Sequence, residues 1–389
     1  MARIVERVRR GGDRELEAIS RQIDGAAAPA APLGRDYLEA ALDRIEPGLR
    51  DALERAITNI EAVAAAQLTE PSVVLLPQGH RVEIRRVAVG AAAVYVPGGR
   101  APYPSSLLMG AIPARVAGVE RVVAATPPAG DGSIADVIAA AAALAGVDSV
   151  YPIGGAQAIA ALAYGTETIA AVDVIVGPGS PWVQAAKALV CGQVGIDGYA
   201  GPSELMVLCD ETAPRDWIAA DLCAQAEHGE DSPLIVVSTG GDCLAALGEA
   251  VEALAAARPG VCDATLSLVE VADEETAIAL VNAYAPEHLQ IACADAEVLA
   301  DAVRTAGCVF VGAAAATAFG DYAAGSNHVL PTGGAGRFTG PLGPSAFSRP
   351  ISLVSVGQTA AANLAETVNT IALAEGFVVH GESAMLRAQ

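Results

Sequence analysis

The middle of the chain alternates short β-branched segments with alanine-rich helical segments. The β-branched segments lie at 122–126, 149–153, 172–176, 205–209, 234–238, 266–271 and 309–311. Helical patterns lie among them at 105–118, 133–145, 155–165, 180–191 and 216–227. Strands that alternate with helices predict parallel sheets joined by crossover helices, in one sheet or in two. We therefore expect an α/β protein.

Helical periodicity flanks this region on both sides. In residues 4–23 and 38–68, apolar side chains recur at helical spacing, and charged side chains occupy the other face. A Gly/Pro-rich stretch at 331–344 precedes a tail, 359–386, that again has a helical pattern. Because a tail this short buries little core of its own, we expect it to dock on the body or on another subunit.

The charge and composition of the chain argue against nucleic-acid and membrane partners. The net charge is −22, and Lys187 is the single lysine, so a nucleic-acid partner is not expected. Alanine accounts for the mean hydropathy of +0.42. The apolar stretch at 137–147 is shorter than the roughly 20 residues of a spanning helix, so we expect no membrane partner. Without an apolar signal segment or a C-x-x-C pair among the seven cysteines, the sequence predicts a cytoplasmic protein with small, buried thiols.

Four segments carry residues suited to metal or proton chemistry. In AQAEHG, Gln225 and His228 are three residues apart on a predicted helix, so both side chains project from one face. In APEHL, Glu287 and His288 follow a proline in a loop or first helical turn, where an imidazole can accept a proton and a carboxylate can activate water. Taken singly, each segment also fits a capping or surface histidine.

The other two segments lie nearer the C-terminus. In GDYAAGSNHVLPT, Asp321 offers a hard oxygen ligand and His328 another imidazole, although an Asx-turn loop explains the segment alone. In the tail, Glu375 precedes His380 by five residues, and solvated polar side chains on a helix explain them equally. Four of the five histidines fall in these four segments, each near a carboxylate or amide, which favours a common site.

Three glycine-rich turns follow predicted strands and open helices. They are VPGG at 96–99, GGAQ at 154–157 and GPGS at 177–180. Backbone N–H groups at such junctions can bind an anion. None is a G-x-G-x-x-G fingerprint, so a standard dinucleotide fold is not indicated, and a purely structural turn remains the alternative for each.

These motifs, in this order, resemble histidinol dehydrogenases. The likeness begins with VRRGGD at 8–13 and continues through YVPGG, GGAQAIAALAYGTE, VGPGS, GQVGID, AGPSE, AQAEH, APEH and GDYAAGSNHVLPTGG to the tail. It covers nearly the whole chain. The resemblance implies two incomplete Rossmann-like parallel-sheet domains, with a helical N-terminal segment and a helical C-terminal tail. The expected divisions are 1–94, 95–204, 205–342 and 343–389, the last being a dimerisation tail.

The family's site residues carry over to matching positions. The resemblance implies one zinc ion per subunit, held by Gln225, His228, Asp321 and His380. It implies Glu287 and His288 as the catalytic pair. It implies substrate contacts from Ser203, Gln225, His228, His288, Asp321, His328, Glu375 and His380. It implies NAD contacts from Tyr95, Gln157 and Ser180.

The implied activity is the oxidation of L-histidinol to L-histidine through histidinaldehyde, with two NAD molecules, in a homodimer whose tails are exchanged. Two alternatives stay open: an NAD-dependent dehydrogenase of another small polar alcohol, and a non-catalytic metal-binding paralogue. The chain departs from the family pattern in lacking an N-terminal arm, which puts dimer packing in question. Ser180 replaces a usual Asn and Val174 replaces a usual Lys, which puts NAD affinity in question. The stretch 313–317, which varies within the family, is here AAAAT.

Overall fold

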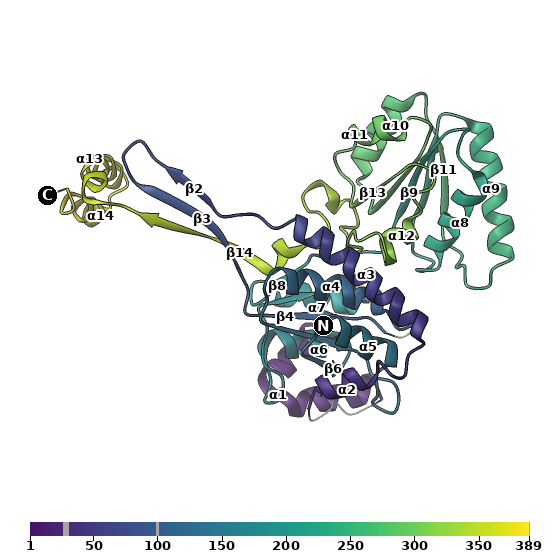
Figure 1. Cartoon of the computed structure of the whole chain (residues 1–389), viewed down its shortest axis with the longest axis horizontal. Coiled ribbons are helices and arrows are strands. Elements are labelled where there is room, and N and C mark those ends of the chain that lie inside the picture. The colour runs from purple at the N-terminus through teal and green to yellow at the C-terminus, as the bar shows by residue number, and fades with distance from the viewer. Residues whose placement is uncertain (26–30, 99–100, 389) are drawn as a thin grey trace. The chain divides into compact units, whose positions relative to one another are not determined.

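The computed structural model describes residues 1–25, 31–98 and 101–388. Contacts between residues divide the chain into two compact units. The first unit contains Met1–Gln67 and Val89–Phe347, and the second contains Leu68–Ala88 and Ser348–Gln389. Figure 1 shows both units.

One sheet of the first unit has the strand order β1-β6-β5-β4-β7-β8. Its strands are β1 (Leu33–Gly34), β4 (Ala91–Tyr95), β5 (Arg121–Thr126), β6 (Ser149–Pro152), β7 (Val174–Val176) and β8 (Gly195–Ile196). All neighbouring pairs are parallel except β1 with β6. Both faces are covered by helices, which explains why these strands are almost wholly apolar.

Side-chain alternation along β4 separates the two faces of this sheet. Ala92 and Val94 belong to the core formed with α2 (Arg35–Ala40), α3 (Pro47–Ala66), α4 (Pro104–Val116) and α5 (Asp136–Leu144). Ala93 and Tyr95 belong to the core formed with α1 (Ala2–Ile23), α6 (Gly155–Tyr164) and α7 (Pro181–Val190). The alternation is the period of two that a strand imposes.

The other sheet of the first unit is entirely parallel, with the order β11-β10-β9-β12-β13. Its strands are β9 (Leu205–Cys209), β10 (Leu234–Ser238), β11 (Leu266–Glu270), β12 (His288–Ala292) and β13 (Cys308–Val311). Helices α8 (Arg215–Ala226) and α9 (Gly241–Ala256) pack on one face. Helices α10 (Glu274–Tyr284) and α11 (Ala296–Asp301) pack on the other, and α12 (Thr317–Tyr322) follows β13. From β9 the chain adds β10 and β11 on one side of the sheet and then β12 and β13 on the other side, with all strands parallel.

The second unit is an antiparallel sheet with two helices. Its strands are β2 (Ser72–Leu75), β3 (Arg81–Ala88) and β14 (Ser348–Ser355), with β3 in the middle. Its helices are α13 (Gln358–Ala374) and α14 (Val378–Met385), which pack on each other. Many large apolar side chains of this unit are exposed, among them Leu75 at 76% and Val379 at 72%.

The structure confirms the α/β class and resolves the open choice of one sheet or two in favour of two. It differs from the expectation in detail. The antiparallel strands β2, β3 and β14 were not predicted, because charged and apolar residues there follow no clear single-face pattern. The expected boundary at 94 falls within β4, and the second unit draws on residues 68–88 as well as the tail. Gly99 of the VPGG turn lies outside the described residues.

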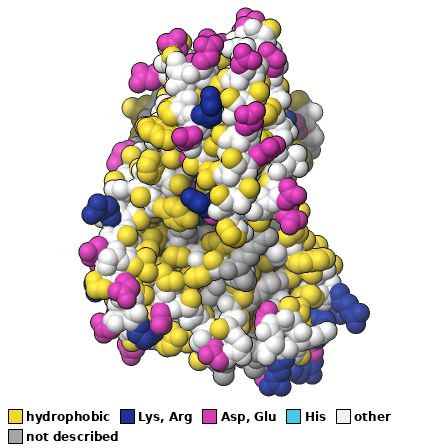
Figure 2. Space-filling model, turned by 90° about the vertical axis from the view of Figure 1, so that its right-hand side faces the viewer, with side chains coloured by type: hydrophobic (Ala, Val, Ile, Leu, Met, Phe, Trp, Pro, Cys, Tyr) yellow, Lys and Arg dark blue, Asp and Glu magenta, His cyan; other side chains and the backbone are white. Residues whose placement is uncertain are grey.

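The surface carries the acidic excess of the composition. Acidic side chains are spread over the face of the molecule in Figure 2, among hydrophobic ones, and basic side chains are fewer there. Among the described helices, none is long and apolar enough to cross a membrane.

Close packing of α4 on the first sheet makes Gly110 sensitive to substitution. A Cβ at Gly110 would lie 2.6 Å from Cγ1 of Val94 and 3.3 Å from Cγ2 of Val176. We expect Gly110→Ala to destabilise the protein by about 1–3 kcal/mol, since overpacking outweighs the gain in helix propensity. Denaturant unfolding measures the effect. Gly48→Ala in α3 is the control, because nothing lies within 4 Å of its added Cβ, and equal stability of the two variants would contradict the prediction.

Candidate active site

Glu287 and His288 lie where the chain enters β12. Glu287 occupies the bend before the strand and His288 is its first residue, so neither lies on a helical turn. Parallel pairing sets His288 opposite Leu205, the first residue of β9. Both side chains are buried. The pair therefore lies at the amino edge of the second sheet, beside the segment that precedes β9.

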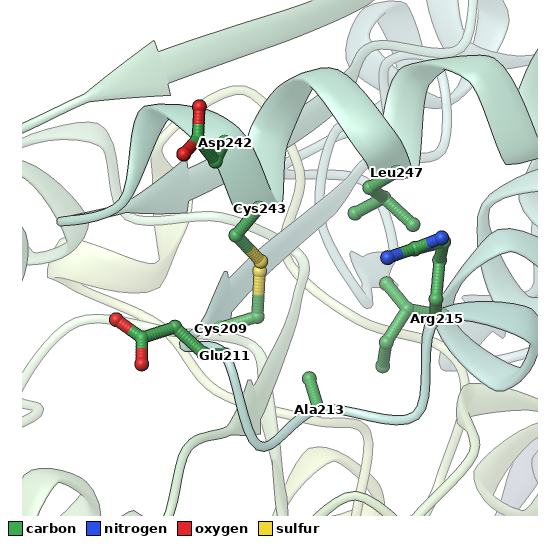
Figure 3. A pocket seen from close by; sticks show the side chains of 8 residues that line it. Cys209, Glu211, Ala213, Arg215, Asp242, Cys243 and Leu247 are labelled. Atoms are coloured by element: carbon green, nitrogen blue, oxygen red, sulfur yellow. The ribbon is translucent and has the colours of Figure 1, made fainter.

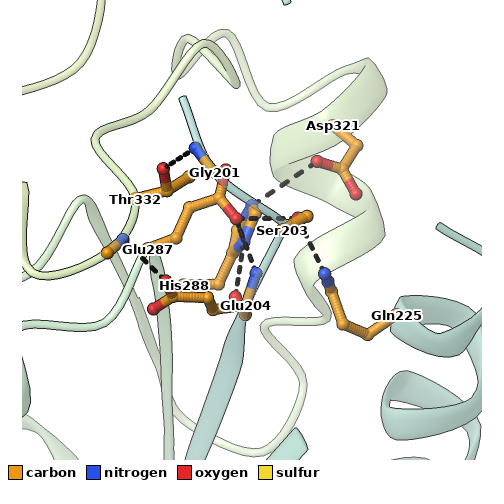
Figure 4. Close-up of polar contacts among 9 residues, drawn as sticks. Gly201, Ser203, Glu204, Gln225, Glu287, His288, Asp321 and Thr332 are labelled. Carbon is orange, nitrogen blue, oxygen red and sulfur yellow. Dashed lines mark hydrogen bonds and ion pairs between the residues drawn. The ribbon is translucent and has the colours of Figure 1, made fainter. Parts of the chain in front are cut away.

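The Glu287 carboxylate accepts hydrogen bonds from that preceding segment. Its Oε2 atom lies 2.7 Å from the Ser203 hydroxyl oxygen and 2.7 Å from the backbone nitrogen of Glu204. The same oxygen lies 3.4 Å from Nδ1 of His288. Figure 4 shows these contacts converging on one carboxylate. A buried carboxylate held by two donors is fixed in orientation, which is what a proton-transfer group requires.

The His288 ring is held on both of its nitrogen atoms. Nδ1 lies 3.0 Å from the backbone oxygen of Glu204, and Nε2 lies 3.7 Å from Oδ1 of Asp321. The ring also stacks on Phe310, with centroids 6.0 Å apart. Burial by itself lowers the pKa of His288, but the Asp321 and Glu287 carboxylates outweigh it and raise the pKa to about 10. Without another cation at Asp321, the ring is therefore an imidazolium at neutral pH.

Asp321 lies near the end of α12, not in an Asx-turn loop. Burial raises its pKa, but contact with His288 and the charges of His328 and His228 outweigh burial and leave the pKa below its usual value. Its carboxylate is therefore ionised near neutral pH. His328 Nδ1 lies 2.8 Å from the Asp321 backbone oxygen, and burial lowers the pKa of His328.

Gln225 connects α8 to the Glu287–His288 pair. Its side chain is buried, and its Nε2 atom donates to the Ser203 hydroxyl at 2.7 Å. Ser203 in turn donates to Glu287, so an amide, a hydroxyl and a carboxylate form one chain of hydrogen bonds. With the amide nitrogen engaged in this way, the Gln225 oxygen remains available as a ligand atom. His228, just beyond the end of α8, is exposed and acts electrostatically on Asp321.

Glu204 is a site residue that the sequence analysis did not select. Its backbone N–H bonds Glu287, its backbone oxygen lies against the His288 ring, and its Oε1 atom accepts a 2.6 Å hydrogen bond from Gly333. Burial, the largest influence, raises its pKa, and the charge of Glu287 raises it further. Its place in the AGPSE motif was the one sign in the sequence that Glu204 belongs to the site. Its contacts with Glu287 and His288 use backbone atoms, which the residue type does not reveal.

The donor chemistry in the first unit fits a metal ion in part. Gln225, His228 and Asp321 supply an amide oxygen, an imidazole nitrogen and a carboxylate oxygen, a mixed set that zinc accepts. Across the described part of the chain, no group of three or more His, Cys, Asp or Glu side chains is arranged to hold a metal. Gln225 would bind through an amide oxygen, and the fourth expected ligand, His380, belongs to the other unit.

Glu375 and His380 occupy the second unit, where both are exposed. Glu375 follows the last residue of α13, and His380 lies in α14 with its ring 5.3 Å from that of Phe377. The two residues thus stand on adjoining helices. They belong to the second unit, whereas Glu287 and His288 belong to the first.

The three expected NAD contacts lie at the carboxyl edge of the first sheet. Tyr95 ends β4, and its hydroxyl accepts a 3.0 Å hydrogen bond from the Gly155 backbone at the start of α6. Gln157, in the first turn of α6, is buried, and its Nε2 atom donates to Asp24, while its Oε1 atom has no partner. Ser180 precedes α7. An unpartnered buried oxygen beside a Gly-rich turn is suited to a ligand donor.

Comparisons with known proteins identify the family to which the chain belongs. The family model described as histidinol dehydrogenase matches residues 1–388. A histidinol dehydrogenase of Pseudomonas syringae pv. syringae is 42% identical, over 99% of this chain and 88% of its own length. One of Nitrosomonas europaea is 42% identical, over 100% of this chain and 92% of its own. The crystal structure of histidinol dehydrogenase from Elizabethkingia anophelis superposes with a TM-score of 0.95 at 33% identity, covering 99% of this chain and 90% of that one. With its full length matched at these identities, the chain belongs to the histidinol dehydrogenase family.

Proposed function

We propose that this protein oxidises L-histidinol to L-histidine through histidinaldehyde, with two NAD molecules and one zinc ion per subunit. The observation that carries the proposal is the buried Glu287–His288 pair, hydrogen-bonded through Ser203 to Gln225 and in contact with Asp321. An acid–imidazole pair beside three potential metal ligands suits alcohol oxidation, in which a proton and a hydride leave the substrate. Family membership supports histidinol as the alcohol and NAD as the hydride acceptor.

Gln225, His228 and Asp321 would hold the zinc ion, together with His380. Zinc bound there would supply a Lewis acid and a template for the nitrogen atoms of the substrate. The remaining functions fall to side chains of the chain. Ser203 and His328 of the first unit, and Glu375 of the second, would contact the polar groups of histidinol.

His288 would take the hydroxyl proton of the alcohol. A base must be neutral before it accepts a proton, and the Asp321 and Glu287 carboxylates now hold His288 in its charged form. Because Asp321 is also an expected metal ligand, engagement of its carboxylate by a cation would weaken its hold on His288. The pKa of His288 would then fall toward the range in which imidazole works as a base.

Glu287 would activate water in the second half of the reaction. Its carboxylate is fixed by Ser203 and by the Glu204 backbone, so one oxygen is positioned toward the imidazole. A proton taken from water by Glu287 would allow hydration of the aldehyde, and the hydrate can then lose a second hydride. NAD would be contacted by Tyr95, Gln157 and Ser180.

The second unit would complete the site in a homodimer with exchanged tails. Its exposed apolar side chains, including Val379 and Leu386, would be covered by another subunit, since a surface this apolar favours association. Exchange of the tail would bring Glu375 and His380 to the partner's site. We place this dimer in the cytoplasm.

Removal of the catalytic groups should slow turnover without loss of zinc. We expect His288→Asn and Glu287→Gln each to lower kcat by about 10²- to 10⁴-fold, the usual value of a general base. Zinc content, measured by metal analysis, should stay near that of the unmodified protein. Glu297→Gln, at an exposed position of α11, is the control. Near-full rates in both active-site variants would refute the assigned roles.

Removal of either histidine ligand should release the metal. His228→Ala and His380→Ala are each expected to lower zinc content and activity, whereas His80→Ala, the remaining histidine, should leave both unchanged. If tails are exchanged, mixing the two inactive variants yields hybrid dimers with one intact site, and part of the activity returns. Mixed dimers as inactive as their parents would count against the exchange.

The yield of NADH separates the proposal from its alternatives. Histidinol oxidised to histidine requires two hydride transfers, so we expect two NADH for each histidinol consumed. A dehydrogenase of another small alcohol would oxidise histidinol poorly, and a non-catalytic paralogue would bind zinc without forming NADH. Absorbance of NADH together with chromatography of histidinol and histidine provides the measurement.

A further inference from the structure

A cavity of about 250 Å³ lies at the edge of the second sheet opposite to the candidate active site. The active-site residues precede β9 and begin β12, whereas the cavity lies where β9 ends and α9 begins. Among the residues that line it are Cys209, Cys243 and Arg215. Figure 3 shows this cavity from close by. In parallel sheets the carboxyl edge is accessible to small molecules, so the cavity gives solutes a route to its thiols.

Strand geometry directs Cys209 toward α9. Leu205, Val207 and Cys209 alternate along β9 and face the core shared with α8 and α9. Cys293, just after β12, packs instead against the core on the other face of the sheet. Cys243 lies in the first turn of α9. It therefore shares its side of the sheet with Cys209 and not with Cys293.

The thiols of Cys209 and Cys243 are in contact. Figure 3 shows the two sulfur atoms pointing toward one another, and the charge of Cys243 acts on the Cys209 thiol. The Cys243 thiol also lies 3.5 Å from the backbone oxygen of Asp210, the residue after Cys209. The start of α9 is thus held against the end of β9 by a pair of sulfur-bearing side chains.

The two thiols differ in access. Cys209 is buried, whereas Cys243 is partly exposed and lines the cavity. Burial, and next the charge of Cys243, raise the pKa of the Cys209 thiol. Because the thiolate is the nucleophilic form, Cys209 itself reacts slowly with a solute. Cys243 is then the thiol that meets an oxidant first, and Cys209 is the one placed to react with the product.

We propose that Cys209 and Cys243 are a redox-active pair that hydrogen peroxide converts to an intramolecular disulfide. The Cys243 sulfur attacks one peroxide oxygen, the O–O bond breaks, and Cys243 becomes a sulfenic acid as water is released. The Cys209 sulfur then attacks the Cys243 sulfur, the S–O bond breaks, and a second water leaves. The two thiols give up two electrons and two protons, and hydrogen peroxide is reduced to water.

The disulfide closes a loop that contains candidate zinc ligands. The segment between Cys209 and Cys243 includes α8 and β10, and α8 carries Gln225 near its end. A covalent link at both ends of this segment restricts its unfolded state, which stabilises the folded form. The oxidised protein is therefore expected to resist heat better than the reduced protein.

The test uses the purified full-length protein, first reduced and then freed of reductant. After treatment with hydrogen peroxide, free thiols are alkylated and the digested protein is analysed by mass spectrometry. We expect a peptide pair joined through Cys209 and Cys243, lost on treatment with dithiothreitol, and a rise in Tm of about 5 °C. Cys209 and Cys243 that remain separately alkylated, or Cys243 that proceeds to sulfinic acid with no joined peptides, would overturn the proposal.

Serine variants separate this pair from the other thiols. Cys209→Ser and Cys243→Ser should each abolish the joined peptides and the rise in Tm. Cys293→Ser is the matched control, because it removes a nearby thiol from the other face of the sheet, and it should leave both signals intact. A joined peptide that persists in Cys243→Ser, or that disappears in Cys293→Ser, contradicts the assignment.

Discussion

Parallel pairing between β9 and β12 is the constraint on which the candidate site depends. The register places His288 opposite Leu205, so the residues just before the two strands, Ser203–Glu204 and Glu287, become neighbours although more than eighty positions separate them. The strands are buried on both faces, and a shift of one residue would turn each side chain to the opposite face. Hydrophobic packing thus fixes the register, and the register fixes the positions of Glu287 and His288.

Much of the fold was predictable from local pattern. β9 and β10 were predicted at their observed bounds, because short apolar runs between turn signals indicate buried strands. β12 was missed, since the polar residues His288 and Gln290 interrupt the apolar run in its sequence HLQIA. Neither the number of sheets nor the antiparallel arm formed by β2, β3 and β14 follows from such patterns, because both depend on pairing between distant segments.

The site was predictable in its residue types but not in its connections. Gln225, Ser203, Glu287, His288 and Asp321 were named from motifs, and the structure brings them into one network. Glu204 was not, because two of its three contacts use backbone atoms. The cysteines were expected to be small buried side chains, and their scattered spacing gave no sign that Cys209 and Cys243 meet, since sheet pairing alone brings them together.

The two edges of the second sheet therefore differ in chemistry because of what each strand end offers. At the amino edge, the segment that precedes β9 contributes backbone donors and acceptors that hold a buried carboxylate and an imidazole in a charged pair. A buried pair of this kind is costly unless each member is fully hydrogen-bonded, so few arrangements of Glu287 and His288 are compatible with the fold. At the carboxyl edge, β9 ends in a thiol among apolar side chains, where a neutral group involves no such cost. Because β9 runs from one edge to the other, the register that sets Leu205 opposite His288 also sets Cys209 opposite Ala292.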